Sequence, residues 1–436
     1  MTRVLLIGGG AREHAIAWKL RQSPDLSALH VAPGNPGIAE IADCHRLHIP
    51  KPGAPEAEIA AFFEDAARIA QEVGAELVAI GPDDPLVFGL TDALESRGFP
   101  VFGPSKAAAA IEGSKSFAKD LMRGYGIPMG RAERFDDFDA ALRYVDSRSG
   151  NVVVKADGMA LGKGAIVTDS HEEAAAALRE LMVEGALGPS GRRVVIEDRL
   201  EGRETSAMAF SDGRTVAHMP FSCDHKPVFD GNRGPNTGGM GAYSPPSWLS
   251  EQYAEVIRHD VTERAIQAMA EDGRPYRGVL FPGIMVTAEG PRVLEFNCRF
   301  GDPEAEVLLP RLETDLLRIM RAVVTGTLSD VDMRWSDQCA VTVMLASGGY
   351  PERYETGKPI SGVEDLDRDV LAFHAGTRRD EAGRLVTNGG RVLAVTALAS
   401  SVEAARERVY HNVARIHFEG MHYRTDIGAA EERVHA

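Results

Sequence analysis

The sequence predicts an α/β protein built from several domains. Its 436 residues suggest two to four domains. Over the first ~100 residues strand-like runs alternate with helical runs, which indicates a parallel sheet covered by helices on both faces. Over the last ~105 residues three strand-like runs precede one amphipathic helix, which is typical of an α+β domain. Between these regions lie glycine-rich loops and apolar strands that carry lysines and carboxylates.

The expected elements follow from apolar periodicity and turn residues. In the first region we expect strands at 4–7, 29–32, 76–80 and 99–102 and a helix at 56–73. In the middle we expect strands at 151–156, 165–168, 193–200, 278–287 and 293–298 and a helix at 251–271. In the last region we expect strands at 340–345, 370–374 and 391–397 and a helix at 401–418.

The composition argues against several classes of protein. Hydrophobic residues make up 44% and charged residues 26% of the chain, as in ordinary soluble globular proteins. The net charge of −16 argues against general nucleic-acid binding, and no apolar run is long enough to span a membrane. The 4 cysteines form no CxxC pair and fit a reducing compartment. The first residues do not form a signal peptide, so we expect a cytoplasmic enzyme.

A glycine turn follows the first expected strand. Residues 8–14 join that strand to a helix, and backbone N–H groups at a helix N-terminus bind phosphate well. Arg12 and His14 could add positive charge, and a plain tight turn is the alternative. A dinucleotide-binding fingerprint is weakened because Glu13 replaces its third glycine and no carboxylate follows the second strand.

A hairpin with a glycine-rich tip is expected in the middle of the chain. Lys155 lies in the apolar strand 151–156, where a lysine is costly unless it has an anionic partner. The tip, residues 157–164, carries Lys163, and such a flap can close over phosphates and exclude water. Its residue order is not that of a P-loop. Further upstream, Lys115 is either a solvated residue of a first helical turn or a phosphate contact.

Two carboxylates and a polar loop follow the hairpin. Glu197 and Glu204 could be exposed edge charges or hydrogen-bond partners for an adenine amino group and ribose hydroxyls. Segments 224–226 and 234–243 are polar, and the second is rich in glycine. Their backbone N–H groups would need partners if buried, and a bound anion would supply them. A flexible surface loop is the alternative.

The strongest chemical signal is the strand at 293–298. Successive side chains on a strand alternate between its faces, so Glu295, Asn297 and Arg299 would share one face. Two hard oxygen donors suit Mg²⁺ or Mn²⁺, which takes its other ligands from water and substrate phosphates. The adjacent guanidinium can bind phosphate or carboxylate bidentately. The alternative is a solvent-facing edge strand with ordinary polar residues.

The opposite face of this strand is expected to enter a core. Leu294, Phe296 and Cys298 would point there. Beyond the strand, Asp302 could cap a helix that has Pro303 at its first position.

These motifs together resemble the ATP-grasp ligases and, within them, the phosphoribosylamine–glycine ligase family. The resemblance covers nearly the whole chain and rests on motifs in the same order, at 8–15, 32–35, 155–164, 195–197, 224–226, 234–245, 295–304, 374–377 and 387–393. Residues 227–233 follow no family motif. The resemblance implies an N-terminal parallel-sheet (pre-ATP-grasp) domain, a two-lobed ATP-grasp core and a C-terminal α+β domain. The expected bounds are 1–104 for the N-terminal domain, 105–191 and 192–326 for the two lobes of the core, and 327–436 for the C-terminal domain.

The resemblance also implies a reaction and a set of roles. ATP, glycine and 5-phospho-β-D-ribosylamine would give glycinamide ribonucleotide, ADP and phosphate in purine synthesis, by way of glycyl phosphate. Lys115, Lys155 and Lys163 would contact the ATP phosphates, Glu197 and Glu204 the nucleoside, and Glu295 and Asn297 a Mg²⁺ or Mn²⁺ ion. Arg299 would hold the γ-phosphate or the glycine carboxylate and, with Lys155, act in catalysis. The candidates for binding phosphoribosylamine are Gly10, Arg12, Glu13, His14, Asp224, His225, Lys226, Asn236 and Thr237.

Three other functions stay open at this point. One is a sibling ATP-grasp carboxylate–amine ligase. A nicotinamide-dependent dehydrogenase is a second, which the missing carboxylate after the second strand disfavours. A non-catalytic nucleotide sensor is the third, although it would not explain metal donors beside a phosphate-binding arginine. We also expect a monomer that acts on small molecules and binds neither nucleic acid nor membrane.

Overall fold

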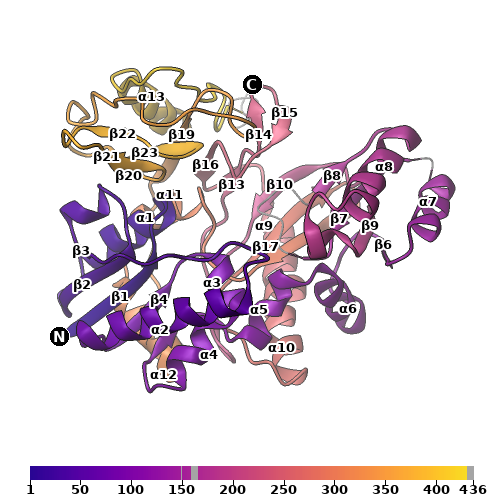
Figure 1. The fold of residues 1–436 in the computed structure, drawn as a ribbon, viewed down its shortest axis with the longest axis horizontal. Helices are drawn as coiled ribbons and strands as arrows, with labels where there is room; N and C mark the ends of the chain where they lie inside the picture. Colours follow the sequence, from indigo (N-terminus) through magenta and orange to yellow (C-terminus); the bar gives the residue numbers. More distant parts are fainter. Residues whose placement is uncertain (149, 159–164, 430–436) are drawn as a thin grey trace.

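The computed structural model describes residues 1–148, 150–158 and 165–429. Figure 1 shows the N-terminal region beside the C-terminal region, while residues 132–198 project away from both as a separate lobe. The strands of the central region lie between this lobe and the N-terminal sheet. The molecule therefore has the mixed α/β architecture that the sequence predicts.

The N-terminal sheet is parallel and covered on both faces, as predicted. Its order is β3–β2–β1–β4–β5, and every neighbouring pair is parallel. Val4 and Leu6 pack into one core cluster with Ile16, whereas Leu5 and Ile7 pack into another with Phe62. The bounds are β1 Thr2–Gly8, α1 Ala11–Leu20, β2 Leu26–Pro33, β3 Asp43–Cys44, α2 Glu56–Glu72, β4 Leu77–Ile80, α3 Asp83–Phe88, α4 Leu90–Glu95 and β5 Val101–Phe102.

The projecting lobe contains the predicted hairpin. Its antiparallel sheet has the order β6–β9–β7–β8, and Val153 on β7 lies opposite Val167 on β8. Lys163 and the rest of 159–164, in the predicted tip, lie outside the described residues. Two helices, α5 and α6, lead into the lobe. The bounds are α5 Lys106–Gly113, α6 Lys115–Tyr125, β6 Ala132–Phe135, α7 Phe138–Ser147, β7 Val152–Ala156, β8 Ala165–Val167, α8 His171–Leu178 and β9 Val194–Asp198.

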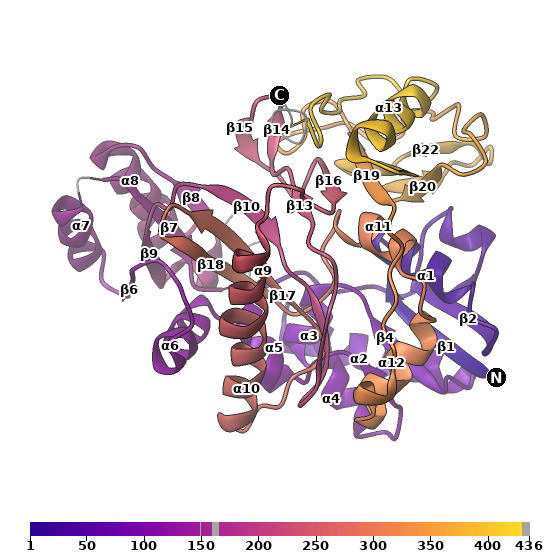
Figure 2. The ribbon, with the colours of Figure 1, turned by 180° about the vertical axis from the view of Figure 1, so that it is seen from behind.

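The central region is an antiparallel sheet built around the long strand β17. This strand pairs with β10, β11 and β18. The helix predicted at 251–271 is one continuous column of α9, a π-helical segment and α10 (Figure 2). The bounds are β10 Arg203–Ser206, β11 Ala209–Asp212, β12 Val216–His218, α9 Glu251–Val256, α10 Arg264–Glu271, β17 Arg277–Thr287, β18 Gly290–Asn297 and α12 Leu316–Thr325.

Strand β18 contains a bulge that changes which side chains face the core. Glu295 pairs with Gly283, but Val293 pairs with Ile284, so Leu294 is an extra residue. Because of this shift Val293 enters the core, whereas Leu294 is only half-buried. The prediction that Leu294 enters the core is therefore wrong. The same prediction is confirmed for Phe296 and Cys298, which are buried in the core.

The turn after β18 also differs from the prediction. Helix α11 (Ala305–Leu308) has Glu304 at its N-cap, so Pro303 is not its first residue. The carboxylate of Asp302 instead lies 3.0 Å from the guanidinium of Arg391. The sequence predicted that Asp302 caps the following helix, but its carboxylate pairs with Arg391 of the C-terminal region.

The C-terminal sheet contains strands from two distant parts of the chain. Its order is β13–β16–β19–β23–β20, and β16 pairs antiparallel with β19. Since β13 and β16 precede residue 326, this sheet crosses the domain boundary expected there. The bounds are β13 Cys223–Asp224, β14 Pro227–Phe229, β15 Arg233–Asn236, β16 Gly241–Ser244, β19 Cys339–Ala346, β20 Leu371–His374, β21 Thr377–Arg379, β22 Leu385–Thr387, β23 Arg391–Ala399 and α13 Val402–Val413.

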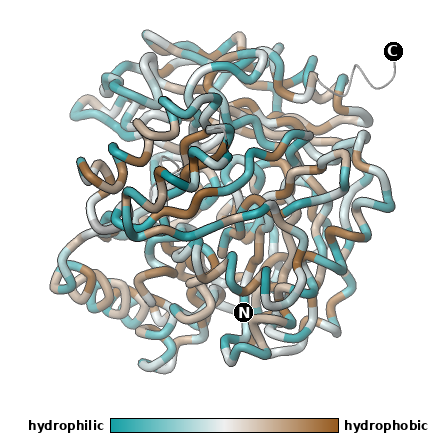
Figure 3. The backbone as a smooth tube through the Cα atoms, turned by 90° about the vertical axis from the view of Figure 1, so that its right-hand side faces the viewer, coloured by the Kyte–Doolittle hydropathy of each residue, from teal (hydrophilic) through white to brown (hydrophobic). Residues whose placement is uncertain are grey.

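No helix among the described residues is long and apolar enough to cross a membrane. In Figure 3 short hydrophobic stretches alternate with hydrophilic ones along the coloured part of the trace.

Candidate active site

Many of the predicted site residues line one cavity of about 220 Å³. It lies where β18, the polar loop that follows β13 and the helices before the projecting lobe meet. The predicted residues in its lining are Lys115, Asp224, Lys226, Asn236, Thr237, Glu295, Asn297 and Arg299. Its other charged lining residues, which the sequence reasoning missed, are Asp83, Glu112, Asp302 and Glu304.

Glu295 supplies a permanent negative charge to this cavity. Its carboxylate lies 3.8 Å from the ammonium of Lys115. Burial would raise the pKa of Glu295, but Lys115, Lys155 and Lys226 lower that pKa to about 2. The carboxylate is therefore ionised at any physiological pH and its oxygens can bind a cation.

Arg299 is held in place by two neighbours in the cavity wall. Its Nη2 donates to Asn297 Oδ1 at 3.0 Å and to Glu112 Oε1 at 3.1 Å. Glu112 also accepts a hydrogen bond from the backbone N–H of Cys298 at 2.6 Å. Burial would lower the pKa of Arg299, but Glu112 and Asp83 raise it, so the guanidinium stays charged. Its buried Nε has no partner among the described residues, so a donor remains for a ligand.

The oxygen donors of β18 fit a divalent ion that also binds phosphate. Glu295 and Asn297 provide hard oxygens, and an amide oxygen keeps a second lone pair besides the one used by Arg299. Among 1–148, 150–158 and 165–429 no three His, Cys, Asp or Glu side chains form a metal-binding group. An ion here would therefore complete its shell with water and substrate phosphate, as Mg²⁺ commonly does.

Lys155 has the anionic partner that its apolar strand requires. Its ammonium lies 3.0 Å from Glu197 Oε1 on the neighbouring strand β9 and donates to the carbonyl of Leu294 at 3.0 Å. Lys119 lies 2.9 Å from the other oxygen of Glu197. All three charged side chains are buried, and two ammonium groups share one carboxylate. The excess positive charge suits a bound phosphate.

The same cluster shifts the acidity of its members. Burial, together with the charge of Lys155, lowers the pKa of Lys119 to about 8 even though Glu197 opposes the shift. Burial would raise the pKa of Glu197, but the two lysines lower it. The sequence offered one signal for Lys119, because it follows Lys115 by four residues and shares its helix face. The predicted contact of Glu197 with adenine stays a prediction.

Lys226 joins the predicted nucleoside end to the predicted phosphoribosylamine side. Its ammonium lies 2.7 Å from Glu204 Oε2. Burial would lower the pKa of Lys226, but Glu204, Asp224 and Glu295 raise it. Asp224 differs from these carboxylates, because burial and the charge of Glu304 raise its pKa well above the usual range. One buried oxygen of Asp224 has no partner among the described residues, which leaves it available for a hydrogen bond with a substrate hydroxyl or amine.

The charged side chains of the N-terminal glycine turn contact groups of the protein itself. Glu13 accepts from the N–H of Gly10 at 2.6 Å and from Arg12 Nε at 2.6 Å. Arg12 also donates to the carbonyl of Phe300, directly after Arg299. Within the described part of the chain, Gly10, Arg12, Glu13 and His14 are not in the cavity lining. The turn thus braces the end of the site strand.

Two of the predicted histidines pack against neighbouring residues. His14 Nδ1 accepts from the backbone N–H of His374 at 2.8 Å, and burial lowers the pKa of His14 to about 3. Burial also lowers the pKa of His225 to about 4, and its ring lies 5.9 Å from that of Tyr243. Both rings are therefore neutral at physiological pH, which disfavours a charge contact with phosphate.

The fold and the cavity together define an ATP-grasp ligase. The hairpin of an antiparallel lobe places Lys155 against the carbonyl of Leu294 on a second antiparallel sheet, and that sheet presents Glu295 and Asn297 to the cavity. The phosphoribosylglycinamide synthetase N domain matches residues 2–112, its ATP-grasp (A) domain 113–305 and its C domain 340–430. The chain belongs to the phosphoribosylglycinamide synthetase family.

Individual relatives agree with this assignment over the full chain. It is 45% identical to phosphoribosylamine–glycine ligase of Halalkalibacterium halodurans, covering 98% of this chain and 96% of that one. It is 46% identical to phosphoribosylamine–glycine ligase of Agrobacterium fabrum, covering 98% of each. The crystal structure of phosphoribosylamine–glycine ligase from Thermotoga maritima matches with a TM-score of 0.82 at 34% identity, covering 98% of this chain and 100% of that one. A biotin carboxylase from Campylobacter jejuni, at 14% identity and a TM-score of 0.74, shares the fold over 99% of this chain and 95% of that one.

Proposed function

We propose that this protein joins glycine to 5-phospho-β-D-ribosylamine at the expense of ATP, giving glycinamide ribonucleotide, ADP and phosphate. The observation that carries the proposal is one cavity in which Glu295 and Asn297 lie beside Arg299 and Lys115. It occurs in a chain that is 45–46% identical, over nearly its full length, to phosphoribosylamine–glycine ligases. Such a cavity suits phosphoryl transfer, which requires charge neutralisation and alignment of the reactants.

The proposed chemistry has two steps. A glycine carboxylate is a poor electrophile, so its oxygen first attacks the γ-phosphorus of ATP, and the bond to ADP breaks. The resulting glycyl phosphate is then attacked at its carbonyl carbon by the ribosylamine nitrogen. Phosphate leaves with the original carboxylate oxygen, and the nitrogen gives up a proton. A bound Mg²⁺ or Mn²⁺ would neutralise phosphate charge during the first step.

We assign the first step to the basic side chains of the cavity and its neighbourhood. Lys115 and Lys155 would contact ATP phosphates, together with Lys163. Arg299 would hold the γ-phosphate or the glycine carboxylate with the nitrogen that lacks a protein partner. Its bonds to Glu112 and Asn297 orient the guanidinium before substrate arrives, so little reorganisation is needed.

The second substrate would lie on the opposite side of the cavity. Asp224, Lys226, Asn236 and Thr237 belong to the cavity lining and offer a carboxyl group, an ammonium, an amide and a hydroxyl. These groups suit the ribose hydroxyls, the phosphate and the amine of phosphoribosylamine. The N-terminal turn would approach this substrate at Gly10. This residue lies close to the cavity wall, because a Cβ added to Gly10 would lie 3.6 Å from a carboxylate oxygen of the lining residue Asp302.

Substrate dependence tests the proposal. Purified protein is incubated with ATP, Mg²⁺ and glycine, with and without phosphoribosylamine, and ADP is measured. We expect sustained ADP release only when both substrates are present. Equal turnover with another amino acid, or without the ribosylamine, would point to a sibling ligase.

We further propose a cytoplasmic monomer, in keeping with the acidic net charge and scattered cysteines, and light scattering of the purified protein tests its mass.

A further inference from the structure

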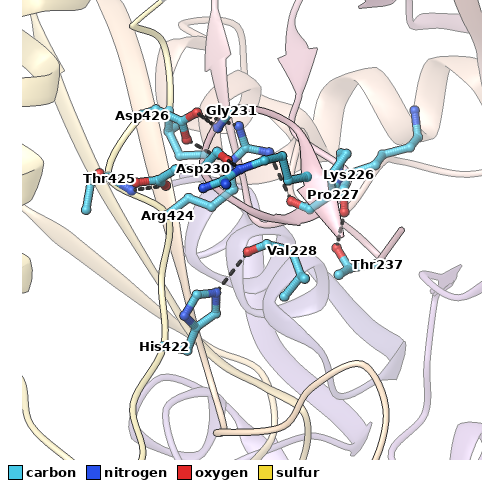
Figure 4. A network of polar contacts seen from close by, with 12 residues as sticks. Lys226, Pro227, Val228, Asp230, Gly231, Thr237, His422, Arg424, Thr425 and Asp426 are labelled. Carbon is cyan, nitrogen blue, oxygen red and sulfur yellow. Dashed lines mark hydrogen bonds and ion pairs between the residues drawn. The ribbon is translucent and has the colours of Figure 1, made fainter. Parts of the chain in front are cut away.

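A polar network joins residues 422–426 to the hairpin formed by β14 and β15, as Figure 4 shows. This hairpin, residues 227–236, has no motif in the family pattern for most of its length. Its two ends nevertheless carry cavity residues, because Lys226 directly precedes it and Thr237 directly follows it.

Arg424 lies at the centre of the network. It is only 1% exposed, although arginine is rarely buried unless it is paired. Its Nε and Nη2 donate to the two carboxylate oxygens of Asp426 at 2.7 and 2.8 Å, which is the bidentate arrangement. Its Nη1 donates to the carbonyl of Pro227 at 2.9 Å. The guanidinium therefore ties the C-terminal segment to the residue next to Lys226.

The tip of the hairpin is held by the same segment. Asp426 Oδ2 also accepts from the N–H of Gly231 at 2.8 Å. Asp230 accepts from both the N–H and the hydroxyl of Thr425. The imidazole of His422 lies 2.8 Å from the carbonyl of Val228 and can donate to it from Nε2. In Figure 4 these contacts all converge from one segment on one side of the hairpin.

The hairpin depends on such external support. It is a two-stranded sheet on its own, and two-stranded hairpins are marginally stable in water. All four residues of β15 are exposed. At its base, the carbonyl of Lys226 accepts from both the N–H and the hydroxyl of Thr237, at 2.9 and 2.7 Å. Because the base is cross-linked in this way, any rotation of the hairpin moves both cavity residues together.

We propose that Arg424 is a positioning residue for the ligation, which acts by fixing the hairpin and thereby Lys226 and Thr237. The inference rests on the proposed function, in which these residues bind phosphoribosylamine. Arg424 itself is not in the described lining of the cavity. Lys115 and Glu295 lie on other elements, whereas the ammonium of Lys226 pairs with Glu204 of the predicted nucleoside end. Loss of Arg424 should therefore weaken binding of phosphoribosylamine more than it weakens binding of ATP.

Kinetics of matched variants test the proposal. Arg424→Met removes the guanidinium, and Asp230→Asn weakens the tip contact without emptying a buried site. Arg415→Met is the control, since its guanidinium pairs with Asp367 and the carbonyl of Asp365 elsewhere in the C-terminal region. We expect the KM for phosphoribosylamine to rise roughly tenfold or more in Arg424→Met and less in Asp230→Asn. The KM for ATP should rise less than the KM for phosphoribosylamine in Arg424→Met and Asp230→Asn, and it should stay within about twofold in Arg415→Met.

A purely structural role predicts a different pattern, namely fewer active molecules, a lower kcat and unchanged KM values. That pattern in Arg424→Met, or an unchanged KM for phosphoribosylamine, would overturn the proposal. If Arg424→Met does not fold, the same comparison in Asp230→Asn decides.

Hydrogen exchange provides a readout independent of the reaction. Exchange of residues 227–240 should quicken in Arg424→Met and Asp230→Asn but not in Arg415→Met. Unchanged exchange of residues 227–240 in Arg424→Met and Asp230→Asn would show that the network does not hold the hairpin. A wild-type protein without phosphoribosylamine-dependent turnover would reject the proposed function, while this exchange experiment would still decide whether Arg424 fixes the hairpin.

Discussion

The N-terminal glycine turn and strand β18 carry similar residues but use them differently. In the turn, Glu13 neutralises Arg12 and also accepts the N–H of Gly10, so its charges are satisfied within the protein. On β18, the carboxylate of Glu295 lies 3.8 Å from the ammonium of Lys115, and just beyond this strand the Nε of Arg299 has no partner among the described residues. The difference shows that charged residues beside a glycine turn can brace a site, whereas those left incompletely paired around a cavity can bind a ligand.

The largest expected effect is in the strand. Glu295→Ala removes the proposed charged metal ligand, so we expect kcat to fall by roughly 10²–10³-fold or more. The fold should persist, because this carboxylate faces a cavity and not a core. Steady-state ADP release and thermal unfolding measure the two properties. Near-normal turnover at low Mg²⁺ would place the metal elsewhere.

The next largest effect belongs to the turn, and it should concern stability. Glu13→Gln leaves the buried guanidinium of Arg12 without its partner, so we expect a loss of about 3 kcal/mol in the free energy of unfolding. Glu72→Gln is the matched control, since its exposed carboxylate pairs with Arg68 on a helix surface and should change stability by less than about 0.5 kcal/mol. Denaturant unfolding compares the two. Equal stability of both variants would mean that the turn does not act as a brace.

A smaller effect is expected for Asn297, the proposed neutral metal ligand on β18. Asn297→Ala removes one oxygen donor and an acceptor for Arg299, so activity at low Mg²⁺ should fall about 10–100-fold. High Mg²⁺ should restore part of it, because the ion keeps Glu295. Asn297→Asp, which retains an oxygen donor, should be less impaired than Asn297→Ala. A titration of activity against Mg²⁺ distinguishes weaker metal binding from a general loss, which Mg²⁺ would not rescue.

The last effect is the pH dependence of stability that His14 and His374 cause. Burial lowers the pKa of His14 to about 3 and of His374 to about 4, against about 6.5 in the unfolded chain. Between these values the unfolded state binds more protons, so stability falls as the pH falls from about 6.5 towards 4, by roughly 1–2 kcal/mol for each group at pH 5. Thermal unfolding at pH 7.5, 6 and 5 measures this slope. His14→Gln should make the slope shallower, and an identical slope would assign the effect to other groups.

The sequence predicted those features that depend on local pattern. The alternation of strands and helices predicted the parallel N-terminal sheet, and the burial cost of Lys155 predicted an anionic partner, which is Glu197. The β18 alternation placed three polar residues around the cavity. The bulge at Leu294 was not predictable, because it depends on the pairing register with β17.

Contacts between distant segments account for the rest. Glu112 pairs with Arg299 across 187 positions of the chain, and Gly231 with Asp426 across 195. No local spacing in the sequence indicates such pairs. Neither the orientation of Arg299 nor the contacts that hold the β14–β15 hairpin could therefore be predicted. For the same reason the sequence could not predict that burial makes the rings of His14 and His225 neutral, and their contacts with phosphoribosylamine stay a prediction.

The fate of the glycine carboxylate oxygens tests the proposed ligation most directly. The cavity offers groups that neutralise phosphate charge, and in it we assign phosphoryl transfer from ATP to the glycine carboxylate. Glycine labelled with heavy oxygen in its carboxylate should therefore transfer one labelled oxygen to the phosphate released in each turnover, as measured by mass spectrometry, and the nucleotide product should be ADP. Unlabelled phosphate, or AMP with pyrophosphate, would exclude glycyl phosphate even if glycinamide ribonucleotide were formed.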